Sequence, residues 1–208
     1  MSVILSLHLS LDPNELIAPC PDNIVALDCE MVGVGKLRRN ALARCSIVDY
    51  HGNVIYDQHI KPNQPITDYR TKWSGILPSH MRRAIPFKVA RKQILDILKS
   101  KIVVGHSLHF DFKILKYRRV ASDIRDTSRC VLLRTKAALP SNQTPSLRTL
   151  SDKVLGREIQ MGVHCSVEDA VASMDLYRTV EEKWEEEMGG KKSSNFLHDS
   201  FWPTWIVT

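Results

Sequence analysis

The sequence predicts an α/β domain in which helices cover the faces of a mixed central sheet. Three features favour this class: three apolar, β-leaning segments follow one another early, short apolar segments then alternate with segments of helical periodicity, and the last part is helical. The expected order of elements is β-β-β-α-β-α-β-α-α. With 208 residues the chain is long enough for one domain with a sizeable core, and it shows no internal repeat.

The expected domain occupies residues 23–188. It follows an N-terminal arm at 1–22, which ends in the proline-containing "APCPDN", and it precedes a C-terminal tail at 189–208 that begins with two glycines. The first three strands are expected at 23–30, 41–50 and 53–60, as a meander whose last turn is His51-Gly52. Two more short strands are expected at 101–106 and 123–128.

Helices are expected where apolar residues recur every three or four positions. The segments with this spacing are 87–100, 106–117, 146–156, and one long helix from 166 to about 188. Gly156 is placed to end the third of these helices, because glycine readily adopts the left-handed conformation that closes a helix.

The composition favours a nucleic acid as partner and argues against a membrane. Lys and Arg number 29 against 23 Asp and Glu, which gives a net charge of +6 and an attraction to anions. No apolar run approaches the ~18 residues of a membrane span. The five cysteines form no C-x-x-C pair, so we expect free thiols of a reducing compartment and no structural zinc site.

Two carboxylates stand inside the first expected strand, "NIVALDCEM". Residues two apart in a strand point to one face, so Asp28 and Glu30 share the face of Ile24 and Ala26. Burying an unpaired ionised carboxylate costs several kcal/mol, and two of them repel each other. We therefore expect a positive charge between them, at a strand end where ligands gather in folds of this kind.

Three further residues stand out, and each also has an ordinary explanation. Asp111 falls on the apolar stripe of its expected helix, where it could be a local polar break or a salt-bridge partner. Asp169 fits a capping box as the N3 residue behind Ser166. His164 precedes Asp169 by five residues in the loop entering that helix, where a histidine is most often an ordinary surface residue.

Taken together, the four acids and the histidine point to metal-dependent hydrolysis. Hard divalent cations take oxygen ligands, and clustered carboxylates supply them. Two such ions ~3.5–4 Å apart can clamp the attacking and leaving oxygens of a phosphodiester, and a histidine can accept a proton from the attacking water. We predict two magnesium or manganese ions at Asp28 and Glu30 and their partners.

The motifs "DCEMVG", "GH....DF" and "H....D" resemble the three exonuclease motifs of the DEDDh class, which has a ribonuclease H-like fold. The wider segments "ALARCSIVDYHGNVIYD", "ITDYRTKWSGI" and "HCSVEDA" resemble a narrower group: the interferon-stimulated exonuclease of 20 kDa, the apoptosis-enhancing nuclease and the RNA exonuclease 4 type. The resemblance covers roughly Ile24 to Trp184. It places the motif residues on Asp28, Glu30, Asp111, Asp169 and His164.

This resemblance implies 3′→5′ removal of nucleoside 5′-monophosphates from single-stranded RNA or DNA. One metal would be held by Asp28, Glu30 and Asp169, and a second by Asp28 with Asp111, directly or through water. His164 would be the general base. The resemblance also suggests that Met31 packs on the terminal nucleoside and Arg70 contacts its sugar or phosphate; the ordinary alternatives are a strand methionine and a surface arginine.

Further expectations concern the binding surface, the substrate preference, the location of the protein and rival functions. Basic side chains that could follow a nucleic-acid backbone, or form a solvated face, are Lys36, Arg38, Arg39, Arg82 and Arg83. Cys165 and Phe110 depart from the residues usual in the group, which bears on substrate preference. We expect a monomer located in the nucleus, the nucleolus included, or the cytoplasm. Two rival functions are a catalytically inactive nucleic-acid-binding module and a hydrolase of very short oligonucleotides.

Overall fold

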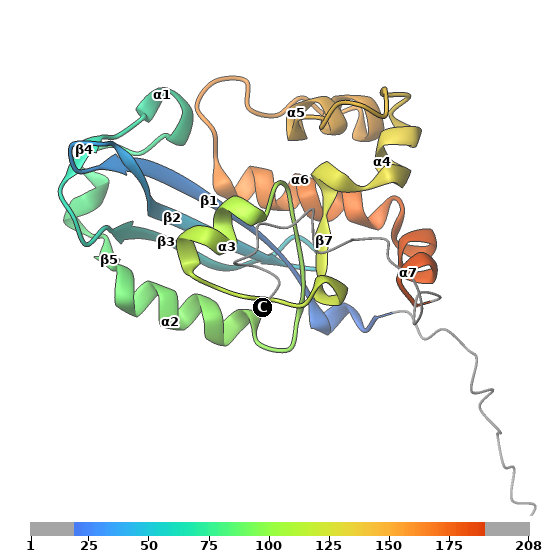
Figure 1. The fold of residues 1–208 in the computed structure, drawn as a ribbon, viewed down its shortest axis with the longest axis horizontal. Coiled ribbons are helices and arrows are strands. Elements are labelled where there is room, and N and C mark those ends of the chain that lie inside the picture. Colours follow the sequence, from blue (N-terminus) through green and yellow to red (C-terminus); the bar gives the residue numbers. More distant parts are fainter. Residues whose placement is uncertain (1–18, 190–208) are drawn as a thin grey trace, which may run out of the picture.

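The computed structural model describes residues 19–189. Its central element is a seven-stranded mixed sheet (Figure 1). Its strands are β1 (Ile24–Val34), β2 (Arg39–Asp49), β3 (Val54–Lys61), β4 (Ile66–Asp68), β5 (Ile85–Pro86), β6 (Ile102–Gly105) and β7 (Ile124–Asp126). Their order is β5-β3-β2-β1-β6-β7, with β4 paired to β1. The first three strands form the predicted antiparallel meander, while β6 and β7 continue the sheet in parallel.

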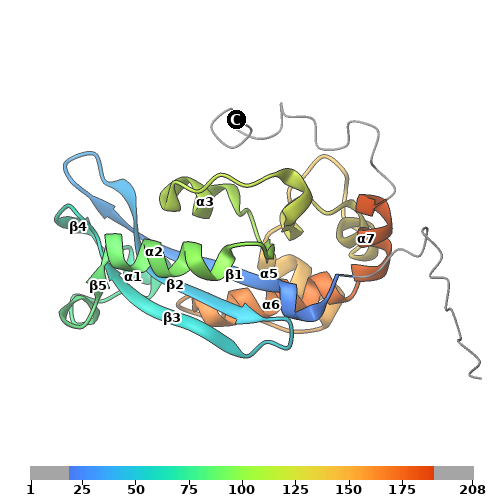
Figure 2. The same ribbon diagram turned by 90° about the horizontal axis from the view of Figure 1, so that it is seen from below.

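Helices cover both faces of this sheet, as expected (Figure 2). They are α1 (Thr71–Ser74), α2 (Phe87–Leu98), α3 (His109–Leu115), α4 (Val131–Lys136), α5 (Leu147–Leu150), α6 (Ser166–Arg178) and α7 (Glu181–Gly189). Helices α2 and α3 pack on one face, and α4 to α7 contribute to the cluster on the other. Several of the short segments that connect these elements are 3-10 turns, such as Pro21–Asn23 before β1.

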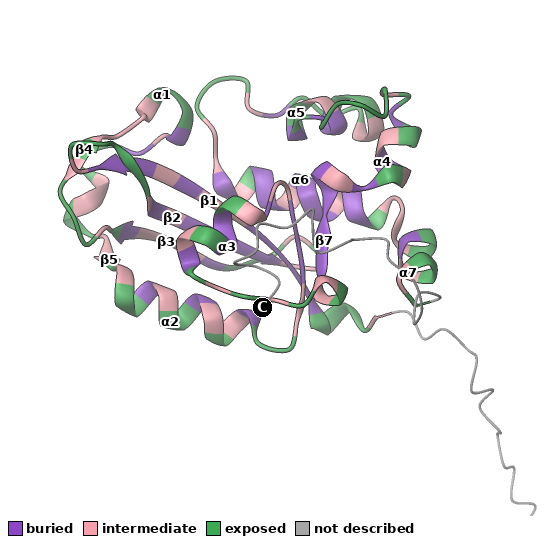
Figure 3. Cartoon of the chain, in the orientation of Figure 1, coloured by how far each residue is buried: buried purple, intermediate pink, exposed green. Residues whose placement is uncertain are grey.

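The alternation of β1 divides the core between the two faces. Val25 and Leu27 belong to the cluster under α2 and α3, whereas Ile24 and Ala26 belong to the cluster that contains α6. These four residues are at most 2% exposed, and buried positions follow the sheet and the inward faces of the helices (Figure 3). Fully burying one large apolar side chain contributes about 1.5–3 kcal/mol, so β1 is held firmly from both sides.

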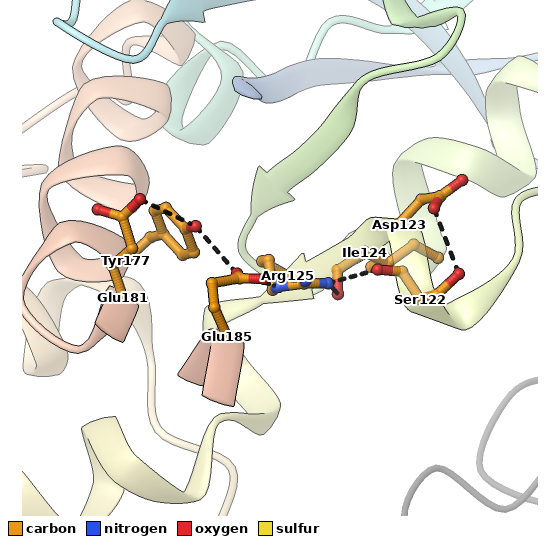
Figure 4. Close-up of polar contacts among 7 residues, drawn as sticks. All are labelled: Ser122, Asp123, Ile124, Arg125, Tyr177, Glu181 and Glu185. Atoms are coloured by element: carbon orange, nitrogen blue, oxygen red, sulfur yellow. Dashed lines mark hydrogen bonds and ion pairs between the residues drawn. The ribbon is translucent and has the colours of Figure 1, made fainter. Parts of the chain in front are cut away.

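The expectation of one long helix from 166 to 188 is wrong, because the chain breaks between α6 and α7. The Thr179 hydroxyl donates to the Leu176 carbonyl at 2.8 Å, and the Val180 amide donates to the Tyr177 carbonyl at 3.0 Å. Both bonds tighten the last turn. The chain then changes direction, and α7 brings Glu185 to the buried guanidinium of Arg125 (Figure 4).

Two other expected helices are shorter or less regular than predicted. The segment 106–117 becomes helical only at His109, because Ser107 has a left-handed backbone (φ 59°) fixed by a bond from its amide to Asp126. In the segment 146–156, α5 is followed by a π-helical turn over Ser151–Leu155. Gly156 ends it in the left-handed conformation, as predicted.

Helices α1 and α4 and strands β4 and β5 were not predicted. The five cysteines are free thiols, as expected. None of the helices between residues 19 and 189 has the length and apolarity to cross a membrane. The predicted arm and tail lie largely outside the described residues, which exclude 1–18 and 190–208.

Candidate active site

Strand β1 presents Asp28 and Glu30 where the sheet is irregular. Its parallel pairing with β6 ends at Ala26, and its register with β2 shifts between Glu30 and Met31. A bulge of this kind bends a strand and re-aims its side chains. Between Ala26, where the pairing with β6 ends, and Gly33, where β4 pairs with β1, the β6 side of β1 has no neighbouring strand, and the two acids lie in this gap.

Helix α6 supplies the third acid. Single carboxylate oxygens of Asp28, Glu30 and Asp169 lie within 4.8 Å of one another. Glu30 and Asp169 are buried, at 6% and 3% exposure, and Asp28 is half-buried. The sequence therefore predicted the grouping of these three acids correctly, although they come from elements about 140 residues apart.

The capping-box explanation for Asp169 is wrong. Cys165, not Ser166, is the N-cap of α6, and no side chain caps the helix. The Ser166 hydroxyl instead pairs with the Ser46 hydroxyl at 2.7 Å. The Asp169 carboxylate is thus free of the capping role and faces the two acids of β1.

Asp111 approaches from α3, on the other side of the opening. It is 5% exposed and lies outside the group of three, but its charge contributes to raising the pKa of Asp28. The thiol of Cys29 donates a hydrogen bond to it, which lowers its pKa, while burial dominates and raises that pKa to about 8. Asp111 is therefore neither a simple polar break nor a member of a surface salt bridge.

The four carboxylates all have raised pKa values. Burial is the largest cause at every one of them. At Asp28 the charges of Asp111, Asp169 and Glu30 add to it. Burial and Asp169 together raise the pKa of Glu30 to about 8, against the opposing effect of Arg44. The cluster accordingly favours protons or cations over four bare charges.

Arg44 does not supply the missing positive charge. It is the register partner of Glu30 on β2, but its guanidinium forms two 2.8 Å hydrogen bonds with the Asp57 carboxylate. Two buried oxygens, Oε1 of Glu30 and Oδ1 of Asp169, have no hydrogen-bond partner in the described chain. Orphaned buried carboxylate oxygens are costly, and these two fit the requirement of a hard divalent cation.

His164 is held beside this cluster by the backbone. Its amide donates to the Trp73 carbonyl of α1 at 3.0 Å, and its Nδ1 lies 3.8 Å from Oδ2 of Asp169. The contact with α1 is close: a Cβ added at Gly75 would lie 2.6 Å from Cγ1 of Val163. The imidazole is 35% exposed, so it can reach both the acids and solvent.

Two residues that orient the acids were missed by sequence reasoning. Gln160 donates from Nε2 to Oδ2 of Asp169 at 2.9 Å. Asp126, at the end of β7, accepts hydrogen bonds from the amides of Ser107 and Leu108 at 2.8 and 3.0 Å and so fixes the turn that leads into α3. Gln160 lies in a loop, and Asp126 lies in the short polar segment "DIRDTS", so neither belongs to a pattern that would reveal its role.

Met31 and Arg70 lie near the site, and their contact with substrate stays a prediction. Met31 is half-buried next to the bulge. Arg70 has a left-handed backbone (φ 52°) and donates to Oδ1 of Asn40 at 2.7 Å and to the Arg38 carbonyl at 2.9 Å. It therefore ties the β1–β2 hairpin to α1. The remaining basic candidates, Lys36, Arg38, Arg39, Arg82 and Arg83, are exposed.

Phe110 and Cys165, the two residues that differ from those usual in the resembling group, are sequence neighbours of Asp111 and His164. Phe110 is 52% exposed and stacks on His109, with ring centroids 3.9 Å apart. The Cys165 thiol accepts a long hydrogen bond from Arg44.

The sequence pattern of the exonuclease family matches residues 25–177. The chain is 45% identical over 208 residues to the apoptosis-enhancing nuclease of Homo sapiens, covering 92% of this chain and 64% of that protein. It is 55% identical over 171 residues to the interferon-stimulated 20 kDa exonuclease-like 2 of Bos taurus, covering 81% and 49%. It is 42% identical over 170 residues to the RNA exonuclease 4 of Mus musculus, covering 81% and 39%. The chain thus spans roughly two-fifths to two-thirds of the length of these relatives.

The chain is also similar to solved structures of Pan2. The Pan2 catalytic unit of Neurospora crassa superposes with a TM-score of 0.67 at 29% identity, over 89% of this chain and 32% of that one. The Pan2 module of Saccharomyces cerevisiae in complex with AAGGAA RNA gives 0.67 at 29% identity, over 86% and 31%. The predicted ribonuclease H-like exonuclease fold is confirmed.

Proposed function

The chain belongs to the exonuclease family, and on this premise we propose that it removes nucleoside 5′-monophosphates from the 3′ end of single-stranded RNA or DNA in a metal-dependent reaction. The observation that carries the proposal is the convergence of Asp28, Glu30 and Asp169 within 4.8 Å, with two buried carboxylate oxygens unpaired. A purely structural cluster would pair those oxygens with donors.

Two divalent ions, magnesium or manganese, fit this arrangement. Asp28, Glu30 and Asp169 would hold one, and Asp28 with Asp111 would hold the other. When bound, such ions stabilise the negative charge that develops on a phosphodiester under attack. The chain's own contribution is to hold together four acids with raised pKa values, whose charges are costly when bare, so that bound cations can displace their protons and neutralise them.

His164 is the proposed general base. Its imidazole is close to Asp169 and still exposed, so one nitrogen can accept a proton from water while the Trp73 carbonyl holds the backbone in place. The water oxygen then bonds to phosphorus and the bond from phosphorus to the upstream 3′ oxygen breaks. A nucleoside 5′-monophosphate leaves, and the shortened strand regains a 3′-hydroxyl.

The relatives support RNA as one substrate, since one of them is named RNA exonuclease 4 and a superposed Pan2 module was solved with RNA. A direct test uses purified protein with magnesium or manganese on matched RNA and DNA strands, labelled at either end. A 3′-phosphate should slow degradation and a 5′ block should not. Circular strands should stay intact; early internal fragments would identify an endonuclease instead.

A further inference from the structure

Charge is distributed very unevenly between the two faces of the sheet. Residues 87–119, which include α2 and α3, contain nine Lys and Arg against Asp96 and Asp111, a net charge of +7. Residues 151–189, which include α6 and α7, contain four Lys and Arg against ten Asp and Glu, a net charge of −6. The two segments pack on opposite faces of the sheet (Figure 2), so the molecule has a basic side at α2 and α3 and an acidic side at α6 and α7.

The basic side is one continuous surface tied to the active site. Arg91 of α2 donates to the Leu115 carbonyl at 2.6 Å and to the Lys116 carbonyl at 3.1 Å, at the end of α3. Helix α3 in turn carries Asp111. Exposed basic residues on either side of this junction, such as Lys88, Lys92 and Lys116, are therefore held at a fixed position relative to the catalytic acids.

Two hollows adjoin this surface. One, of about 470 Å³, follows α2 past Phe87, Lys88 and Lys92. A second, of about 210 Å³, shares Phe87 and Asn63 with the first and extends to Leu42 and Ile114. Leu42 is the register partner of Met31, and Ile114 lies three residues after Asp111 on α3. The two hollows thus adjoin each other along α2, and the second reaches residues of β2 and α3 that are neighbours of Met31 and Asp111 in register or sequence.

We infer that this surface, the α2–α3 basic face, binds the sugar-phosphate backbone of the substrate strand upstream of the nucleotide being removed. The inference rests on the proposed function and adds a binding surface to it. A flexible single strand can follow the hollows, and its phosphates meet lysines along α2. Its lysines on α2 are distinct from the hairpin residues Lys36, Arg38 and Arg39, although Val34 and Ala41 of the same hairpin line the second hollow.

The test compares double variants with the same change of charge. Lys88→Gln with Lys92→Gln removes two cations from the basic face, and Lys153→Gln with Lys183→Gln removes two exposed cations from the acidic side. A third pair, Lys36→Gln with Arg39→Gln, samples the hairpin. The kcat/KM of each protein is measured on a 20-nucleotide strand and on a trinucleotide of the same 3′ sequence, at several salt concentrations.

Wild type should prefer the long strand, and this preference should weaken as salt rises. The Lys88/Lys92 variant should raise KM for the long strand by roughly 2–30-fold, as expected for two exposed ion pairs. The slope of log KM against log salt should fall by about 1.4, or about 0.7 for each phosphate contact of a single strand. The Lys153/Lys183 variant should keep the wild-type preference and slope.

The inference would be overturned if the Lys88/Lys92 and Lys153/Lys183 variants had the same KM and the same salt dependence. It would also be overturned if only the Lys36/Arg39 variant had a raised KM, because the strand would then bind at the hairpin. Failure of wild type to degrade either substrate would instead overturn the proposed function, so the two failures are distinguishable. Binding of the labelled 20-mer, followed by fluorescence anisotropy without metal, gives the same comparison independently of turnover.

Discussion

Gln160 and Asp169 are joined by a 2.9 Å hydrogen bond, in which the side-chain amide donates to Oδ2 of the carboxylate. The other oxygen, Oδ1, is buried without a partner. The backbone of Gln160 is left-handed (φ 56°), and its amide donates to Glu168 at 3.1 Å. The loop before α6 therefore orients one oxygen of Asp169 and leaves the other without a hydrogen bond.

Gln160→Asn should weaken divalent-metal binding by roughly 10–100-fold, the usual effect of losing a residue that orients a ligand. Asparagine tolerates the left-handed backbone better than glutamine, so this shorter side chain removes the bond to Asp169 without adding strain. Titration calorimetry with manganese measures the affinity. Wild-type affinity in this variant would show that Gln160 only braces the loop.

Asp28→Asn should abolish nearly all turnover and leave the fold intact. The substitution removes a carboxylate predicted to contact both ions. It also relieves repulsion from Asp111, Asp169 and Glu30, so the metal-free variant should melt at a higher temperature than wild type. Activity assays in excess magnesium and thermal melts without metal test the two parts. Near-wild-type turnover would contradict the two-ion assignment.

Stability without metal should fall between about pH 5 and pH 8.5. Free Glu and Asp titrate near pH 4, whereas the pKa values of Glu30 and Asp111 in the folded protein are about 8. The folded state therefore binds more protons in this range, so the stabilisation is complete below about pH 4 and is lost as pH rises through about 8.

Glu30→Gln is the matched control for this pH dependence, because it cannot lose a proton at that position. Its melting temperature should fall less than that of wild type over the same range, and magnesium should reduce the fall in wild type. Parallel curves of melting temperature against pH for wild type and Glu30→Gln would contradict the raised pKa of Glu30.

The sequence predicted more of the site than of the helices around it. Asp28 and Glu30 are identifiable because carboxylates interrupt a buried strand, and Asp111 because it interrupts an apolar stripe. The break at Thr179 could not be predicted in this way, because Val180 and Trp184 continue the apolar spacing of α6 across it. Beyond the break, Glu185 of α7 bonds to the buried Arg125, which is distant in the sequence. The basic face was missed for a similar reason: only the packing of α2 and α3 on one side gathers its lysines.

Glu185→Gln should destabilise the protein by about 3–5 kcal/mol, because it leaves the buried charge of Arg125 without its counter-ion. Arg125 is 2% exposed and makes two bonds to the Glu185 carboxylate, at 2.7 and 2.5 Å (Figure 4). Urea unfolding measures the loss. The double variant Arg125→Met, Glu185→Leu should recover most of it, since no charge is then buried; no recovery would mean that packing of α7 sets the cost.

His164→Ala should reduce the rate by about 10²–10⁴-fold, the usual contribution of a general base. The predicted metal ligands are unchanged, so manganese affinity should survive. Stability should change little, because the bond to Trp73 uses the backbone amide that alanine retains, and the imidazole contacts Asp169 only at 3.8 Å. A histidine that merely braced the loop would give the opposite pattern, with a lower melting temperature and a pH–rate curve of unaltered shape. The two pH–rate curves, recorded for wild type and variant with saturating magnesium, decide the matter: loss of a general base changes the shape of the curve as well as its height, whereas loss of a bracing residue lowers only the height.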